Sequence, residues 1–133
     1  MPFVEQTSSS KFIVWGEYKD GKDEERQVLV KKDDSIIFFV NEIRDSDFKA
    51  PDGRTQQYLI VTLMEMKDKK PTMTETTASL SPPTYLETQL GLNPNFEKEH
   101  VVRPGDIVQV TYLGRDDKKN NSPHTFKLAY WES

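Results

Sequence analysis

The stretch from Ser35 to Leu63 constrains the fold more than any other part of the chain, because it holds two strand-like runs joined by a polar loop. Residues 36–43 are mostly β-branched or aromatic, and residues 56–64 alternate between two faces, as strands do. The loop ends in Ala50-Pro51-Asp52-Gly53, where proline presets φ for a turn and glycine accepts positive φ. We therefore expect a β-hairpin at the centre of the fold.

Length and composition indicate one folded domain that carries no strong overall charge. The chain has 133 residues, 11% of them aromatic, which is enough for one core and typical of a folded rather than a disordered chain. The formal net charge is -4, so binding to nucleic acid would need a local basic groove rather than a positive field over the whole molecule.

The absence of cysteine excludes disulfides, metal sites with thiolate ligands and cysteine nucleophiles. The sequence shows no signal-type N-terminus and no apolar run approaching the roughly 18 residues of a membrane span. We therefore expect a cytoplasmic protein without a membrane partner.

Alternating patterns outside the central hairpin predict further strands, over residues 11–18, 26–32, 72–80, 107–113 and 124–131. The polar residues 19–25 suit a turn between the first two of these. Residues 81–91 carry the one helix signal, with Ser81 as a plausible N-cap and Gly91 as a left-handed C-terminal cap. Leu86 and Leu90 would form its buried stripe, and Leu80 could pack on Tyr85.

From Ser35 onward the predicted order is three strands, a short helix and two strands. This is the order of the OB fold, a small Greek-key barrel that binds single strands or sugars. We therefore expect a single all-β domain over residues 1–133. It would comprise a five-stranded OB-like barrel over 35–133, with the helix between its third and fourth strands, and an N-terminal two-stranded extension over 1–34.

Several stretches resemble bacteriophage-type single-stranded DNA-binding proteins of the OB fold. They are the two β runs across a long loop, the junction Ala78-Ser79-Leu80-Ser81-Pro82, and the segment 103–114, RPGDIVQVTYLG. The last is the strongest, because a Gly-Asp turn, an alternating strand ending in Tyr-Leu-Gly and a final Phe-containing strand recur in that group. The resemblance implies sequestration of single-stranded DNA in replication, recombination or repair, with partners among the proteins of those processes.

Such a protein needs flat side chains for base stacking and cations for phosphates. The candidates for stacking are Phe48, Tyr58, Tyr112 and Trp131. The candidates for phosphate contact are Arg44, Lys49, Arg54, Arg115 and Lys127. Five of these nine fall within fifteen residues, from Arg44 to Tyr58, on the central loop and its flanks.

The sequence also allows structural roles for the aromatic residues and other functions for the chain. Tyr112 and Trp131 also suit a core or the end of a barrel, and Trp15 suits packing of the N-terminal strands onto the barrel. Catalytic motifs and metal-ligand spacings are missing, so we expect no enzyme activity, cofactor or metal. The alternative function is a protein-interaction module whose threonine-rich edge strand, residues 72–78, pairs with a partner or a second copy. Carbohydrate binding is a third class, which the separation of Trp15 and Trp131 disfavours.

Overall fold

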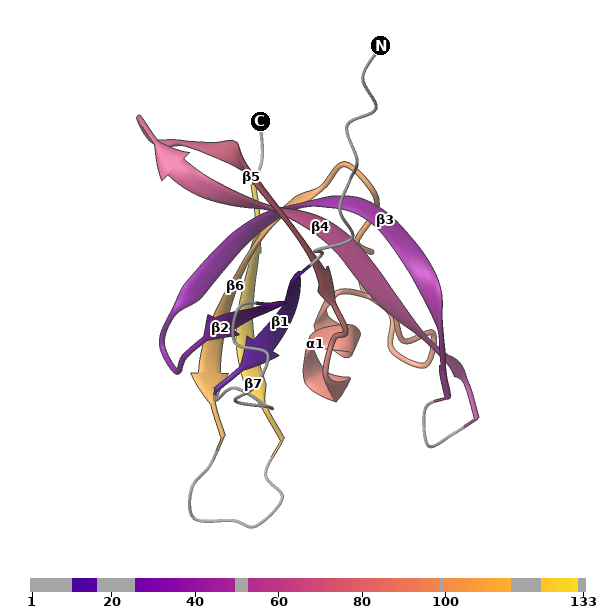
Figure 1. Ribbon diagram of the computed structural model, residues 1–133. Helices are drawn as coiled ribbons and strands as arrows, with labels where there is room; N and C mark the ends of the chain where they lie inside the picture. The colour runs from indigo at the N-terminus through magenta and orange to yellow at the C-terminus, as the bar shows by residue number, and fades with distance from the viewer. Residues whose placement is uncertain (1–10, 17–25, 50–52, 99, 116–122, 132–133) are drawn as a thin grey trace.

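A single β-sheet and one short helix make up the fold in the computed structural model, which describes residues 11–16, 26–49, 53–98, 100–115 and 123–131. The sheet curls into a half-barrel with the helix at its lower end (Figure 1). The strands are β1 (Lys11–Trp15), β2 (Gln27–Val30), β3 (Ser35–Lys49), β4 (Thr55–Lys67), β5 (Lys70–Leu80), β6 (Ile107–Gly114) and β7 (Thr125–Tyr130), and the helix is α1 (Thr84–Gln89). The all-β prediction is confirmed.

The seven strands are hydrogen-bonded in the order β2-β1-β5-β4-β3-β6-β7. The strands from β5 to β7 in that order are antiparallel to their neighbours, whereas β1 runs parallel to both β2 and β5. The expected turn over residues 19–25, between the first two strands, stays a prediction. Residues 17–25 themselves lie outside the described residues.

Strand β5 lies between β4 and β1 in the sheet, but β1 covers only its C-terminal end. It pairs with β4 along its length and with β1 at Ala78 and Ser79, and the sheet ends at β2 and β7. The expectation that residues 72–78 form an edge strand is therefore corrected at Ala78 only, because among the described residues 72–77 pair with β4 alone. The low apolar content of these residues predicted a solvent-exposed face. It did not indicate that the N-terminal strand β1 would pair with β5 on the side opposite to β4.

Strand β3 runs six residues further than the expected end at Ile43, because the polar residues after it pair with β4. Arg44 lies opposite Tyr58, and Lys49 lies opposite Thr55. A bulge between Val40 and Glu42 resets the alternation, so that Ile43 rather than Glu42 packs against the core. The hairpin turn is shorter than predicted; Gly53 has the expected positive φ of 85°, and residues 50–52 lie outside the described residues.

The hydrophobic core fills the inside of the curl and is built from alternate residues of each strand. Its fully buried side chains include Phe38 and Val40 of β3, Leu59 and Val61 of β4, and Val108 and Val110 of β6. The other face of the sheet we call the outer face. It carries the residues between these in the alternation, among them Ile37, Phe39 and Arg44 of β3, Tyr58 and Ile60 of β4, Ile107 and Gln109 of β6, and Lys127 and Ala129 of β7.

The N-terminal strands close part of the open side of the half-barrel. Ile13, Trp15 and Val30 belong to the core. The Trp15 ring packs edge-on against Phe126 of β7, with ring centroids 4.8 Å apart, and lies 5.9 Å from Tyr112 of β6. The predicted packing role of Trp15 is confirmed.

Helix α1 begins three residues later than the expected N-cap at Ser81. Its N-cap is Pro83, which is extended and provides no side-chain cap. A residue before proline is disfavoured in the helical region, so the pair Pro82-Pro83 delays the helix. Leu86 and Leu90 are fully buried as predicted, but the expected contact of Leu80 with Tyr85 is not supported, because Tyr85 is 48% exposed while Leu80 is buried.

Gly91→Ala is expected to destabilise the protein more than Gly53→Ala. Both glycines have positive φ, at 82° and 85°, which costs an alanine roughly 1–2 kcal/mol. A Cβ at Gly91 would also lie 3.0 Å from the Cα of Val101, whereas a Cβ at Gly53 would meet no atom within 4 Å. Urea unfolding of the two variants measures the difference. Equal losses of free energy of unfolding would show that the backbone around Val101 yields freely.

Candidate nucleic-acid interface

Arg44 and Tyr58 form a cross-strand pair on the outer face. They are opposite each other in the register of β3 and β4, one pair along from Ile43 and Leu59, which face the core. Arg44 is exposed and Tyr58 is half-buried. The structure thus places a guanidinium and an aromatic ring side by side on a surface that solvent reaches.

Hydrogen bonds to neighbouring side chains orient the Arg44 guanidinium, but they leave it accessible to a phosphate. It donates a hydrogen bond to Glu42 Oε2 at 2.7 Å, and the two side chains are 52% and 54% exposed. The hydrogen bond to Glu42, and after it one to Tyr58, raises the pKa of Arg44 above its ordinary value. An ion pair this exposed is weak and is screened by salt, so a phosphate can compete with Glu42 for Arg44.

The remaining members of the predicted cluster separate in the structure. Lys49 is exposed and donates a 2.8 Å hydrogen bond to Thr55 Oγ1 at the end of the β3–β4 hairpin. Phe48 lies within β3 rather than in a loop, and its side chain is outside the described part of the structure. Arg54 is paired with a carboxylate of α1, which favours a structural role over contact with a ligand. Its Nη2 lies 2.9 Å from Glu87 Oε1 of α1, in a pair only 20% and 5% exposed.

Tyr112 is a core residue and does not belong to the candidate interface. It is 3% exposed, its ring lies among Trp15, His124 and Phe126, and its hydroxyl lies 2.6 Å from His124 Nδ1. The alternation of β6 places Tyr112 in line with Val108 and Val110, on the face toward the core. A ring enclosed in this way offers no surface for a base.

The two remaining cations of the prediction, Lys127 and Arg115, lie on the β6–β7 side of the sheet. Lys127 is exposed on the outer face of β7, opposite Thr111. Arg115 is exposed and directly follows β6. They lie away from Arg44, because β6 separates β7 from β3 and Arg44 lies beyond the part of β3 that pairs with β6.

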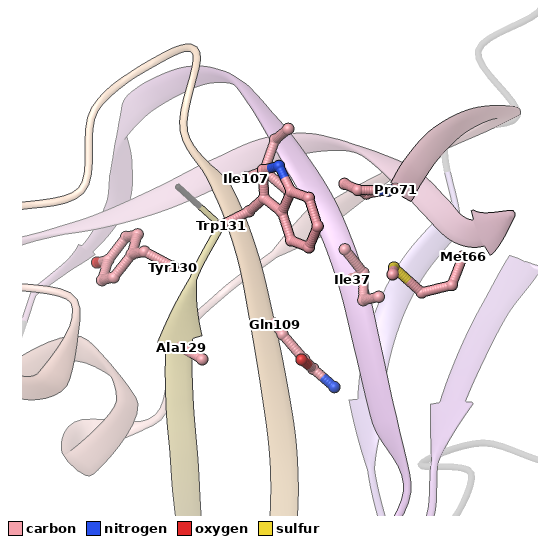
Figure 2. Close-up of a pocket in the computed structure, with 8 residues that line it drawn as sticks. All are labelled: Ile37, Met66, Pro71, Ile107, Gln109, Ala129, Tyr130 and Trp131. Atoms are coloured by element: carbon pink, nitrogen blue, oxygen red, sulfur yellow. The ribbon is translucent and has the colours of Figure 1, made fainter. Parts of the chain in front are cut away.

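Trp131 lies at an apolar cleft of about 280 Å³ between the end of β7 and the β4–β5 hairpin. Its ring is 44% exposed, and its backbone N–H donates to Ile107 O at 2.9 Å. Figure 2 shows the indole lying near Ile107, with Pro71, Met66 and Ile37 on the opposite side of the cleft. Tyr130 points the other way, and burial, with a smaller contribution from Asp106, raises its pKa to about 12.

Sequence reasoning missed the partners of Trp131 in this cleft. Alternation predicts that Ile107 faces away from Val108, and this is confirmed. The sequence does not indicate that the β4–β5 hairpin, through Met66 and Pro71, lies close to the end of β7. Lys67 and Lys70 pair beyond them at the hairpin's end and are exposed, so cations lie one residue from the apolar wall.

Within the described ranges, no group of three or more histidine, aspartate or glutamate side chains is placed to hold a metal ion. Helix α1, with six residues, is too short to cross a bilayer, and no described helix is long and apolar enough to do so. Comparison of the chain with protein-family models, with curated proteins and with solved structures finds no match. A function therefore has to be inferred from the surfaces just described.

Proposed function

We propose that the chain is a single-stranded nucleic-acid-binding protein built on an OB-type barrel. More specifically, we propose that it sequesters single-stranded DNA without strong sequence preference, in replication, recombination or repair. The strand order supports the OB assignment, because β3, β4 and β5 are followed by α1 and then by β6 and β7, and β3 pairs with both β4 and β6. Strands β1 and β2 would be an addition to that barrel.

The observation that carries the proposal is the Arg44–Tyr58 pair on the outer face. Sequence-tolerant binding of single strands combines aromatic rings, on which any base can stack, with cations that neutralise phosphates. In the OB assignment Tyr58 lies on the second barrel strand, and OB folds use the faces of their second and third strands for binding. The pair places both kinds of contact where such a barrel would meet its ligand.

The Trp131 cleft offers a second stacking position on the same face. Ile37, on its wall, and Arg44 are seven positions apart on β3, which is no more than roughly 23 Å at about 3.3 Å per residue. Single OB folds cover about 4–16 nucleotides, a stretch long enough to reach both places. The mechanism is sequestration, in which bases stack on Tyr58 and Trp131 while Arg44, Lys49 and Lys127 contact phosphates.

The proposal is tested by fluorescence-anisotropy titration of a labelled oligo-dT of about 30 nucleotides, longer than the footprint of one OB fold, beside the matching duplex. With three phosphate contacts, the logarithm of the affinity should fall with the logarithm of salt with a slope of about −2. Selective binding to the single strand is expected. Binding that is absent at low salt, or equal for the duplex, would overturn the proposal.

Trp131→Ala is expected to weaken oligo-dT binding by about fivefold, at the lower end of what one stacked base contributes. We expect the lower end of that range because Trp131 lies just beyond the end of β7. The matched control is Leu113→Ala, which removes an outer-face side chain that is 42% exposed and lies outside this cleft. The same anisotropy titration measures both variants, and an equal effect of the two would exclude a stacking role for Trp131.

A further inference from the structure

The Trp131 cleft has two apolar walls that face each other. The indole of Trp131 and Ile107 form one wall, and Met66, Pro71 and Ile37 form the other (Figure 2). Met66 and Pro71 are opposite each other in the register of β4 and β5, so they lie side by side on one face of the hairpin. The volume of about 280 Å³ is just below the range of small-molecule sites, about 300–1,000 Å³, so the cleft suits a single flat ring.

The walls of the cleft disfavour a charged ligand and favour an aromatic ring. The residues that line it include no aspartate, glutamate, histidine, lysine or arginine. A phosphate would lack a cation there, whereas an uncharged base would meet an indole on one side and a thioether on the other. Sulfur–aromatic contacts are favourable, and the flexible methionine side chain adapts to rings of different size. Met66 and Trp131 are 48% and 44% exposed, so a ligand can reach both.

Gln109 supplies a hydrogen-bonding group beside these walls. It lies on the outer face of β6, is exposed, and is opposite Ile37 on β3 and Ala129 on β7. Neither neighbour has a polar side chain, and Figure 2 shows the Gln109 side chain extending from β6 toward β3. A side-chain amide presents a donor and an acceptor next to each other, and the edges of nucleobases present donors and acceptors that match it.

A cation for the neighbouring phosphate lies just outside the cleft. Lys127 is exposed on the outer face of β7, two residues before Ala129 and so roughly 7 Å from it along the strand. It is not one of the residues that line the cleft. The outer face thus offers an uncharged place for a base and, next to it, a charged place for a phosphate, which are the two contacts that a nucleotide needs.

We infer that the Trp131 cleft encloses one base of the bound single strand between the Trp131 indole and the Met66 thioether, with the Gln109 amide hydrogen-bonded to the edge of the base. The inference rests on the proposed function and adds to it two contacts, at Met66 and Gln109, that stacking on Trp131 alone does not need. Because the amide can rotate to present its donor or its acceptor, thymine and cytosine should bind about equally.

Methyl NMR on the full chain tests the enclosure of the base. The chain has four methionines, and Met66→Leu identifies the Met66 signal in protein labelled at the methionine methyl carbons. The same oligo-dT is expected to move that signal upfield, because the ring current of a stacked base shields a methyl group over its face. An abasic oligomer of equal length, which keeps the phosphates and lacks the bases, should not move it. Met73, which is 55% exposed but outside the cleft, is the internal control.

Anisotropy on the same samples separates this inference from the proposed function. If oligo-dT binds while the Met66 signal stays in place, or if Met66 and Met73 move by equal amounts, the cleft encloses no base and only the function stands. If the abasic oligomer moves the Met66 signal as far as oligo-dT does, the shift does not come from a base and the inference is overturned. If oligo-dT does not bind, the function and the inference fail together.

Gln109→Glu tests the contact to the edge of the base. A carboxylate accepts but does not donate, so it can bond the amino group of cytosine, whereas the carbonyl of thymine loses its donor. The ratio of oligo-dC to oligo-dT affinity is expected to rise about fivefold over the native ratio, the lower end for a base-edge contact. Gln56→Glu adds the same charge on the outer face of β4, outside the cleft, and is expected to weaken both oligomers equally. An unchanged ratio in Gln109→Glu, or an equal rise in both variants, would contradict the contact.

Discussion

Replacing Arg54 with methionine is expected to lower the free energy of unfolding by about 3–5 kcal/mol, the usual cost of removing one partner from a buried ion pair. The change leaves the Glu87 carboxylate, whose side chain is only 5% exposed, without its cation. Domains of this size are stable by about 5–15 kcal/mol, so the loss would be a large fraction of the total. Urea unfolding at neutral pH, followed by circular dichroism, measures it.

The matched control is Arg44→Met, which makes the same chemical change at an exposed pair on the outer face. Because both Arg44 and Glu42 are more than half exposed, the free energy of unfolding should hardly change. Affinity for oligo-dT should fall instead, and the salt slope should become shallower by about 0.7, the share of one phosphate contact. A variant of Arg54 as stable as the native protein would contradict the structural role assigned to that residue.

Tyr58→Ala is expected to weaken oligo-dT binding by roughly 5- to 150-fold, which corresponds to about 1–3 kcal/mol for a stacked base. Tyr58→Phe keeps the ring and should bind nearly as tightly as the native protein. Unlike Arg44→Met, neither change should alter the salt slope, because no phosphate contact is lost. Anisotropy titration over a series of salt concentrations measures the affinity and the slope together.

Tyr85→Ala provides the control for a merely exposed aromatic ring. Tyr85 is 48% exposed, but it lies on α1 rather than on the outer face. Its loss should leave oligo-dT affinity unchanged. If Tyr58→Ala and Tyr85→Ala bind equally well, or if Tyr58→Phe binds as weakly as Tyr58→Ala, stacking on Tyr58 is not the basis of binding.

The strands of this protein could be predicted from the sequence because each has alternate residues committed to one core. Leu59, Val108 and Phe126 all lie in segments whose alternation was visible, and all three are buried. The second half of β3 could not be predicted in this way. Its residues are polar on both faces and belong to the strand only because β4 pairs with them, for example at Arg44 and Tyr58.

The candidate interface was predictable in part, and the failures have physical causes. Arg54 and Arg44 look alike in sequence, but only Arg54 meets a buried carboxylate on a distant helix. The alternation of β6 already placed Tyr112 in line with core residues. The Trp131 cleft depends on how the β4–β5 hairpin lies against the end of β7, and local sequence patterns carry no information about such contacts.

Photo-crosslinking most directly tests the central claim that the outer face binds single-stranded DNA. A bromodeoxyuridine oligomer is irradiated with the native protein, and tryptic peptides are identified by mass spectrometry. We predict crosslinks in the peptide Thr55–Lys67, which carries Tyr58, and in the peptide 128–133, which carries Trp131. Crosslinks confined to other peptides, or their absence at saturating protein, would contradict the account.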